Sequence, residues 1–117
     1  MTEKELLQRT KTFALRVIKL VNALPNTSAG RAIGNQLIRS GTSVASNYRA
    51  ACRGRSKAEF IAKLGTVEEE ADESCLWLEL IIESGLMEEK SVASLLQEAS
   101  ELTAIFAKSR ISAKSNK

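Results

Sequence analysis

The stretch FIAKLGTVEEEADESCLWLELI, residues 60–81, decides the fold class of this chain. Its apolar or small residues recur at alternating steps of three and four. This spacing draws a narrow stripe along one side of a helix and favours near-parallel packing against other helices. The stripe consists of Phe60, Leu64, Val67, Ala71, Ser74, Leu78 and Ile81. The sequence therefore predicts a long α-helix that buries one side.

Three further segments of the chain repeat this spacing. Each is expected to form a helix with its own buried stripe, and the four stripes would meet in one core. The stripe positions are Leu6, Thr10, Phe13, Val17, Leu20 and Leu24 in the first segment, Leu37, Gly41, Val44, Tyr48 and Ala51 in the second, and Val92, Leu95, Ala99, Leu102 and Phe106 in the last.

Short breaks separate the four segments, and each combines a residue that stops a helix with side chains that can cap the next one. The break residues are Pro25, Thr27 and Ser28, then Gly54, Ser56 and Glu59, and finally Ser84 and Gly85. Connections this short make consecutive helices antiparallel. We therefore predict an all-α protein, an antiparallel up-down four-helix bundle in a single domain over residues 1–108, followed by a flexible basic tail at 109–117.

The composition excludes several kinds of catalytic and metal site. The 117 residues include no histidine, and the two cysteines, Cys52 and Cys75, form no C-x-x-C pair. Zinc sites and Ser-His or Cys-His catalysis therefore lack their usual residues, and we expect neither enzyme activity nor a cofactor. The acidic run 68–73 is not expected to bind metal, because carboxylate-metal sites in bundles use Glu-x-x-His pairs. A solvated or interface surface is the expected role of that run.

The start of the chain and its hydropathy bear on location. The first residues, MTEKELLQRTK, are highly charged and do not form the apolar core of a signal peptide. No apolar run approaches the ~20 residues needed to cross a bilayer. We expect a cytoplasmic protein that does not bind membranes.

The charges are divided between two halves of the chain. Residues 6–58 contain ten Lys or Arg and no acid, whereas residues 59–101 contain twelve acids and two Lys. On a helical wheel of 100° per residue, four arginines of the second helix fall within an arc of about 80°. They are Arg31, Arg39, Arg49 and Arg53. Such a row can follow a phosphate backbone, or it can pair with acids of the other helical hairpin or of a neighbouring subunit.

Two residues at the edge of the predicted core are candidates for contacts between helices or subunits. Trp77 lies about 100° from the stripe of its helix, either as a boundary residue of the bundle or as an anchor in a subunit interface. Asn47 borders the stripe of the second helix, and a buried amide needs hydrogen-bond partners. We expect Glu70 or Glu73 to supply them and so to fix the register of the second helix against the third.

The block from Gln36 to Ile81 resembles the four-helix-bundle family encoded in intervening sequences of 23S ribosomal RNA, and the resemblance extends over nearly the whole chain. The segments that carry it are Arg39-Ser40, Ser43, Asn47-Tyr48-Arg49-Ala50-Ala51, Arg53 to Ser56, Ala58-Glu59-Phe60, Lys63-Leu64, Glu69-Glu70, Asp72-Glu73 and Trp77-Leu78. The resemblance implies a ring-shaped homopentamer. It also implies a relation to accessory proteins of diversity-generating retroelements, which bind nucleic acid through a basic surface and work with a reverse transcriptase.

The resemblance also suggests which residues bind nucleic acid. The matching basic positions are Arg39, Arg49, Arg53, Arg55 and Lys63. No catalytic residue is implied, because the family has no established catalytic activity. The first hypothesis is a non-enzymatic oligomer that binds RNA or DNA through a basic helical surface, with a reverse transcriptase or a ribosomal component as a further partner. The alternative is a protein-interaction scaffold whose charged faces serve only subunit or partner contacts.

Overall fold

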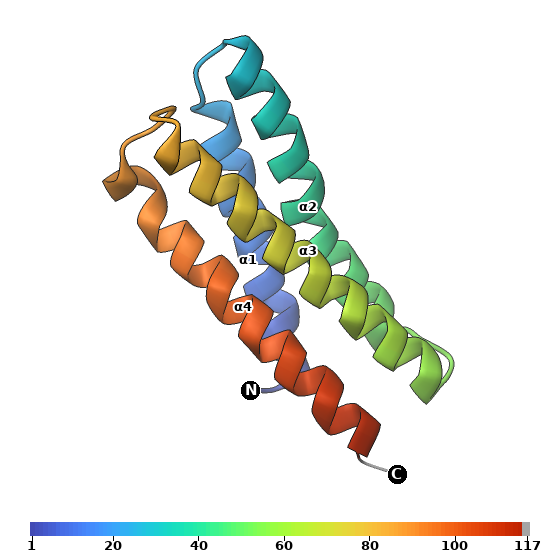
Figure 1. The fold of residues 1–117 in the computed structure, drawn as a ribbon. Coiled ribbons are helices and arrows are strands. Elements are labelled where there is room, and N and C mark those ends of the chain that lie inside the picture. The colour runs from blue at the N-terminus through green and yellow to red at the C-terminus, as the bar shows by residue number, and fades with distance from the viewer. Residues whose placement is uncertain (116–117) are drawn as a thin grey trace.

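Four α-helices form nearly all of the computed structural model, which describes residues 1–115. They are α1 (Glu3–Asn22), α2 (Ser28–Cys52), α3 (Lys57–Glu83) and α4 (Glu89–Ser115). Consecutive helices run in opposite directions and pack side by side in an elongated bundle of 49 by 20 by 19 Å (Figure 1). The predicted all-α, antiparallel up-down four-helix bundle is confirmed. None of the helices in the described range is long and apolar enough to cross a membrane.

The helix ends follow from side-chain and glycine chemistry at the breaks. Thr27 caps α2, where its hydroxyl oxygen accepts a 3.0 Å hydrogen bond from a backbone N–H of the first turn. Ser56 caps α3 in the same way. Ser56 and Glu59 do not form a full capping box, because the Glu59 carboxylate accepts from the backbone N–H of Arg55, at 2.7 Å, and not from that of Ser56. Gly85 ends α3 with a φ of +77°, a conformation that favours glycine.

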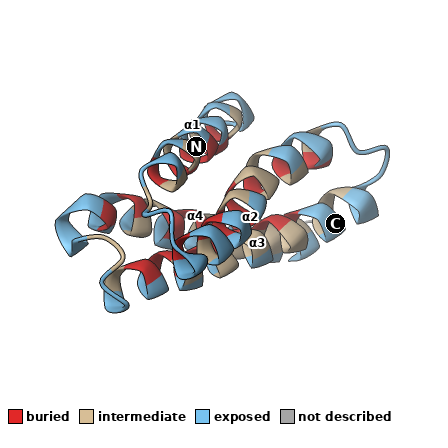
Figure 2. Ribbon diagram, turned by 90° about the horizontal axis from the view of Figure 1, so that it is seen from above, coloured by how far each residue is buried: buried red, intermediate tan, exposed pale blue. Residues whose placement is uncertain are grey.

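The core follows the four predicted stripes. Buried sides of all four helices face one another, and exposed residues cover the outside (Figure 2). Leu24 and Phe60 are the two stripe positions that are only half-buried, because both lie at helix ends where fewer neighbours cover them. The rings of Tyr48 and Phe106 stack obliquely with centroids 5.1 Å apart, which links α2 to α4 across the core.

The last helix is longer than predicted. We placed the end of the folded domain at residue 108, but α4 continues to Ser115, so most of the predicted tail is helical. The extension contains no glycine or proline to stop it. It is also attached to α3, because Arg110 Nε donates to Glu68 Oε1 at 2.8 Å. The last two positions of the predicted tail, 116 and 117, lie outside the described residues.

Small residues allow α1 and α2 to pack closely. Gly41 of α2 faces Val17 of α1, and a Cβ added at Gly41 would lie 2.8 Å from both γ-methyl groups of Val17. One residue before Gly41, the hydroxyl oxygens of Ser40 and Ser74 are 2.8 Å apart in the core between α2 and α3. The close contact sets the spacing of the first two helices, and the serine pair helps to fix the register of α2 against α3.

Candidate nucleic-acid interface

The predicted arginine row on α2 does not form one continuous site. Arg31 lies in the first turn of α2, where its Nη1 donates to Asn26 Oδ1 at 2.9 Å. Arg49 and Arg53 lie at the other end of the helix, and 18 residues at 1.5 Å each separate Arg31 from Arg49 by about 27 Å. Arg31 therefore belongs to the α1–α2 turn and not to the surface that holds the other two.

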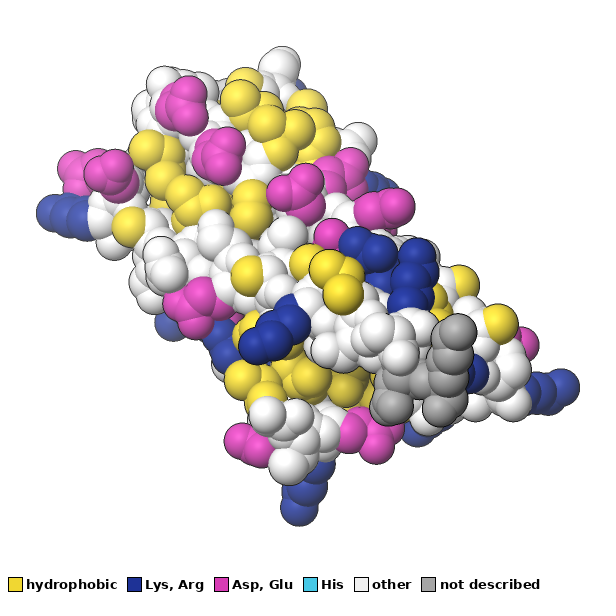
Figure 3. All heavy atoms as spheres, turned by 60° about the horizontal axis from the view of Figure 1, so that its bottom comes forward, with side chains coloured by type: hydrophobic (Ala, Val, Ile, Leu, Met, Phe, Trp, Pro, Cys, Tyr) yellow, Lys and Arg dark blue, Asp and Glu magenta, His cyan; other side chains and the backbone are white. Residues whose placement is uncertain are grey.

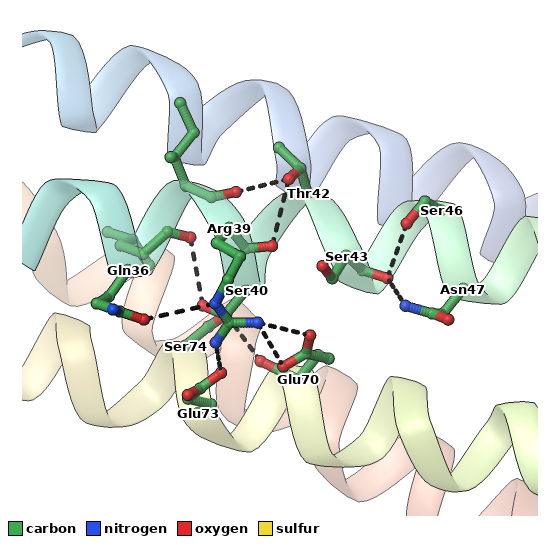
Figure 4. A network of polar contacts seen from close by, with 12 residues as sticks. Gln36, Arg39, Ser40, Thr42, Ser43, Ser46, Asn47, Glu70, Glu73 and Ser74 are labelled. Atoms are coloured by element: carbon green, nitrogen blue, oxygen red, sulfur yellow. Dashed lines mark hydrogen bonds and ion pairs between the residues drawn. The ribbon is translucent and has the colours of Figure 1, made fainter.

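Arg39 is held by acidic side chains of the same chain. Its guanidinium reaches across from α2 to α3, where Nη1 lies 2.9 Å from Glu70 Oε2 and Nη2 contacts Glu73 (Figure 4). Burial raises the pKa of Glu70, the nearby Glu73 carboxyl raises it further, and Arg39 opposes both effects. The sequence left open whether the basic row binds phosphates or pairs with acids. Arg39 pairs with acids of α3 in the same chain.

Asn47 does not make the contact predicted for it. Its side-chain NH₂ donates to the Ser43 carbonyl at 2.9 Å within α2 (Figure 4), and its Oδ1 accepts from Lys63 Nζ at 3.5 Å. The prediction that Glu70 or Glu73 would satisfy this amide was wrong, because Arg39 occupies both carboxylates. Asn47 still links α2 to α3, through a lysine and not through an acid.

A groove between α1 and α2 brings together the strongest group of cations. Arg49 and Arg53 line it from α2, and Lys4 and Lys11 line it from α1. Its volume is about 830 Å³. Within residues 1–115, none of these four side chains has a carboxylate within ion-pair distance. Because no ion pair within residues 1–115 occupies these cations, they are available to an anionic ligand.

The floor of this groove is small and uncharged. Leu7 and Ala14 come from α1, and Ala45 and Cys52 from α2. Burial and the neighbouring Glu3 side chain together raise the pKa of the Cys52 thiol to about 11. The thiol is therefore protonated at neutral pH, and it acts as an apolar surface and not as a nucleophile.

A second basic hollow lies at the turn between α2 and α3. It has a volume of about 420 Å³ and is lined by Arg53, Arg55 and Lys63, with Glu59 as the one acid among the lining residues that the structure describes. Glu59 is bound to the backbone at the start of α3, so its charge is fixed close to the three cations. Arg53 lines both hollows, which makes the basic surface continuous around the end of α2.

Trp77 and the outer face of α3 form a surface that is apolar and acidic, in contrast to the two basic hollows. Trp77 is half-buried against the core, and its indole N–H is buried without a hydrogen-bond partner in the described chain. One turn apart on the outer side of α3, Leu76 is 47% exposed and Leu80 is 37% exposed. Glu69 and Asp72 lie beside Leu76 in a shallow hollow of about 420 Å³. Figure 3 shows acidic and exposed hydrophobic side chains next to one another on the visible face.

The α1 half of the groove was missed by sequence reasoning. Lys4 and Lys11 are seven residues apart and so lie on one side of α1, which is a signal present in the sequence. A helical wheel drawn for α2 alone does not show which face of α1 lies beside it. The structure keeps Arg49 and Arg53 in the candidate interface, adds the two lysines, and separates Arg31 and Arg39 from it.

Comparisons with known proteins agree with this architecture. Residues 2–108 match the sequence model described as 23S rRNA-intervening sequence protein. The fold is also similar to the crystal structure of a protein with unknown function from the S23 ribosomal protein family of Bacteroides thetaiotaomicron VPI-5482. That similarity has a TM-score of 0.86 and 29% sequence identity, over 94% of this chain and 98% of the other. Comparison with curated proteins gave no match. The chain, matched over nearly its whole length, belongs to the 23S rRNA-intervening sequence protein family.

Proposed function

We propose that this chain is a non-enzymatic, oligomeric bundle that binds RNA or DNA through the groove between α1 and α2. The observation that carries the proposal is the group of four cations, Lys4, Lys11, Arg49 and Arg53, with no carboxylate within ion-pair distance in the described chain. Rows of Lys and Arg on a rigid helical surface neutralise phosphates without reading bases. Arg55 and Lys63 extend the same surface around the end of α2.

The outer face of α3 supports the oligomeric part of the proposal. Leu76 and Leu80 are exposed between acidic residues, and burying such a pair against another protein surface is favourable by about 25 cal/mol for each Å² of apolar area. A ring, such as the predicted homopentamer, forms when one face of each subunit contacts a different face of the next.

Binding should depend steeply on salt. We expect the protein to bind several unrelated RNAs and DNAs at low salt, because contacts to phosphates carry no sequence information. Four phosphate contacts predict that log K for a duplex falls with log salt at a slope of about −3.6. A titration by fluorescence anisotropy between 50 and 200 mM salt measures the slope. No binding at the lowest salt would end the proposal.

Assembly should depend on the exposed leucines of α3. We expect Leu76→Lys combined with Leu80→Lys to convert an oligomer into a monomer of 12.8 kDa, because two buried apolar contacts become charges. Light scattering after size-exclusion chromatography measures the mass. Ile111→Lys is the matched control, since Ile111 is 59% exposed on α4 and is expected to lie outside the contact. A wild-type chain that is already monomeric would contradict the oligomer.

One observation favours the alternative of a protein-interaction scaffold. Arg39 shows that an arginine of the basic hairpin can be used entirely for pairing with Glu70 and Glu73. If Arg49 and Arg53 pair in the same way with acids of another copy, the groove serves assembly and not nucleic acid. A reverse transcriptase or a ribosomal component as partner stays a prediction.

A further inference from the structure

We infer that the α1–α2 groove receives a double helix and contacts both of its strands, in preference to a single strand. This inference rests on the proposed nucleic-acid function and names the class of nucleic acid that the groove fits. Three features of the groove carry it: the placement of its cations in two rows, the chemistry of its floor, and the engagement of its polar side chains.

The four cations form two rows on two antiparallel helices. Lys4 and Lys11 are two turns apart on α1, about 10 Å along the axis. Arg49, in the last turn of α2, and Arg53, at its C-cap, are one turn apart, about 6 Å. Packed helices lie about 8–10 Å apart, and the contact of Gly41 with Val17 keeps this pair close. The grooves of B-form DNA are about 6 and 12 Å wide between strands. Two rows at this spacing can each lie against the phosphates of a different strand.

The floor of the groove lacks the surface that single strands use. Proteins that hold single strands stack bases on aromatic side chains, which contributes about 1–3 kcal/mol per base. The aromatic residues of this chain are one tryptophan, one tyrosine and three phenylalanines. None of them lines the groove: Phe13, Tyr48 and Phe106 are buried in the core, and Phe60 and Trp77 belong to α3. An unstacked strand would gain nothing from the small Ala14 and Ala45.

The polar side chains of the groove are already engaged with their own helices. Thr42 Oγ1 donates to the Ile38 carbonyl at 2.6 Å, and Ser46 Oγ donates to the Ser43 carbonyl at 3.3 Å. Gln8 Nε2 donates to Thr12 Oγ1 at 3.2 Å within α1. The two hydroxyl groups therefore do not direct donors at exposed base edges, which are the groups that a single strand offers and a duplex hides. Charge contacts to the two backbones are what the groove can supply.

The test compares one duplex with its own strands. A labelled 20-base-pair RNA, the DNA of the same sequence and each separated strand are titrated at one fixed salt concentration by fluorescence anisotropy. We expect each duplex to bind at least about 10-fold more tightly than either of its strands, because only the duplex engages both rows. Neutralising either row should make the slope of log K against log salt for the duplex less negative by about 1.8, because two phosphate contacts are lost.

Matched variants separate the two rows. Lys4→Gln with Lys11→Gln removes the α1 row, Arg49→Gln with Arg53→Gln removes the α2 row, and circular dichroism checks that both stay helical. Lys90→Gln is the control, because Lys90 lies on α4, its side chain is 83% exposed, and its one ion pair among residues 1–115 is with Glu88. Two outcomes overturn the inference and leave the proposed function standing. One is that a single strand binds as tightly as the duplex or more tightly. The other is that neutralising one row weakens duplex binding while neutralising the other row does not. No binding of any probe overturns both.

Discussion

Replacing Arg49 and Arg53 with glutamate is expected to lower the affinity for nucleic acid by roughly 100-fold or more at about 0.1 M salt. The two substitutions change the charge of the groove by four, and they place carboxylates where phosphates would lie. Neither arginine has an ion-pair partner in the described chain, so the substitutions break no internal pair. Anisotropy measures the affinity, and light scattering on the same samples measures the assembly.

The same variant distinguishes the two functional hypotheses. Lost binding by an intact oligomer supports nucleic acid as the ligand, whereas collapse to a monomer supports pairing between subunits. The control is Lys90→Glu with Lys108→Glu, which produces the same net charge through residues of α4. If this control loses as much affinity, overall charge and not the groove would be responsible. Unchanged binding by the Arg49 and Arg53 variant would contradict the site itself.

The fold was accessible from sequence because it depends on local periodicity. The alternating spacing of apolar residues set which side of each helix is buried, and short breaks set the antiparallel order. The prediction from apolar spacing is wrong at helix ends, where the apolar pattern is not continued by further residues. Leu24 and Phe60 continue their stripes in sequence but reach the edge of the core. The end of α4 depends on a contact between Arg110 and Glu68, 42 residues apart, which no local pattern contains.

The candidate site was accessible only in part, because it is formed between helices. A wheel places Arg39, Arg49 and Arg53 on one side of α2, but it does not show that acids of α3 reach one of them and lysines of α1 flank the other two. Asn47 was assigned the wrong partner for the same reason. The residue of α3 that lies opposite Asn47 depends on how far α2 is shifted along α3. The buried pair Ser40 and Ser74 helps to set that register.

The close contact between α1 and α2 should make Gly41 one of the least replaceable positions in the chain. We expect Gly41→Leu to lower the free energy of unfolding by about 3 kcal/mol, because overpacking of a filled core forces side chains and backbone to move. Even the first added carbon would lie 2.8 Å from both γ-methyl groups of Val17, which is fully buried and has little rotamer freedom. Urea denaturation at one fixed protein concentration measures the loss.

Gly65→Ala provides the opposite expectation in the interior of α3. A Cβ there has Arg110 Cδ as its nearest neighbour, at 3.6 Å, so it makes an ordinary contact. Because alanine is favoured over glycine in a helix by about 0.8–1.0 kcal/mol, this variant should be more stable than the wild type.

A Gly41→Leu protein as stable as the wild type would show that α1 and α2 are not held together at this point. The groove depends on the same contact: where Gly41→Leu still folds, α1 must move away from α2, the two rows of cations separate, and duplex affinity should fall although no charge has been changed.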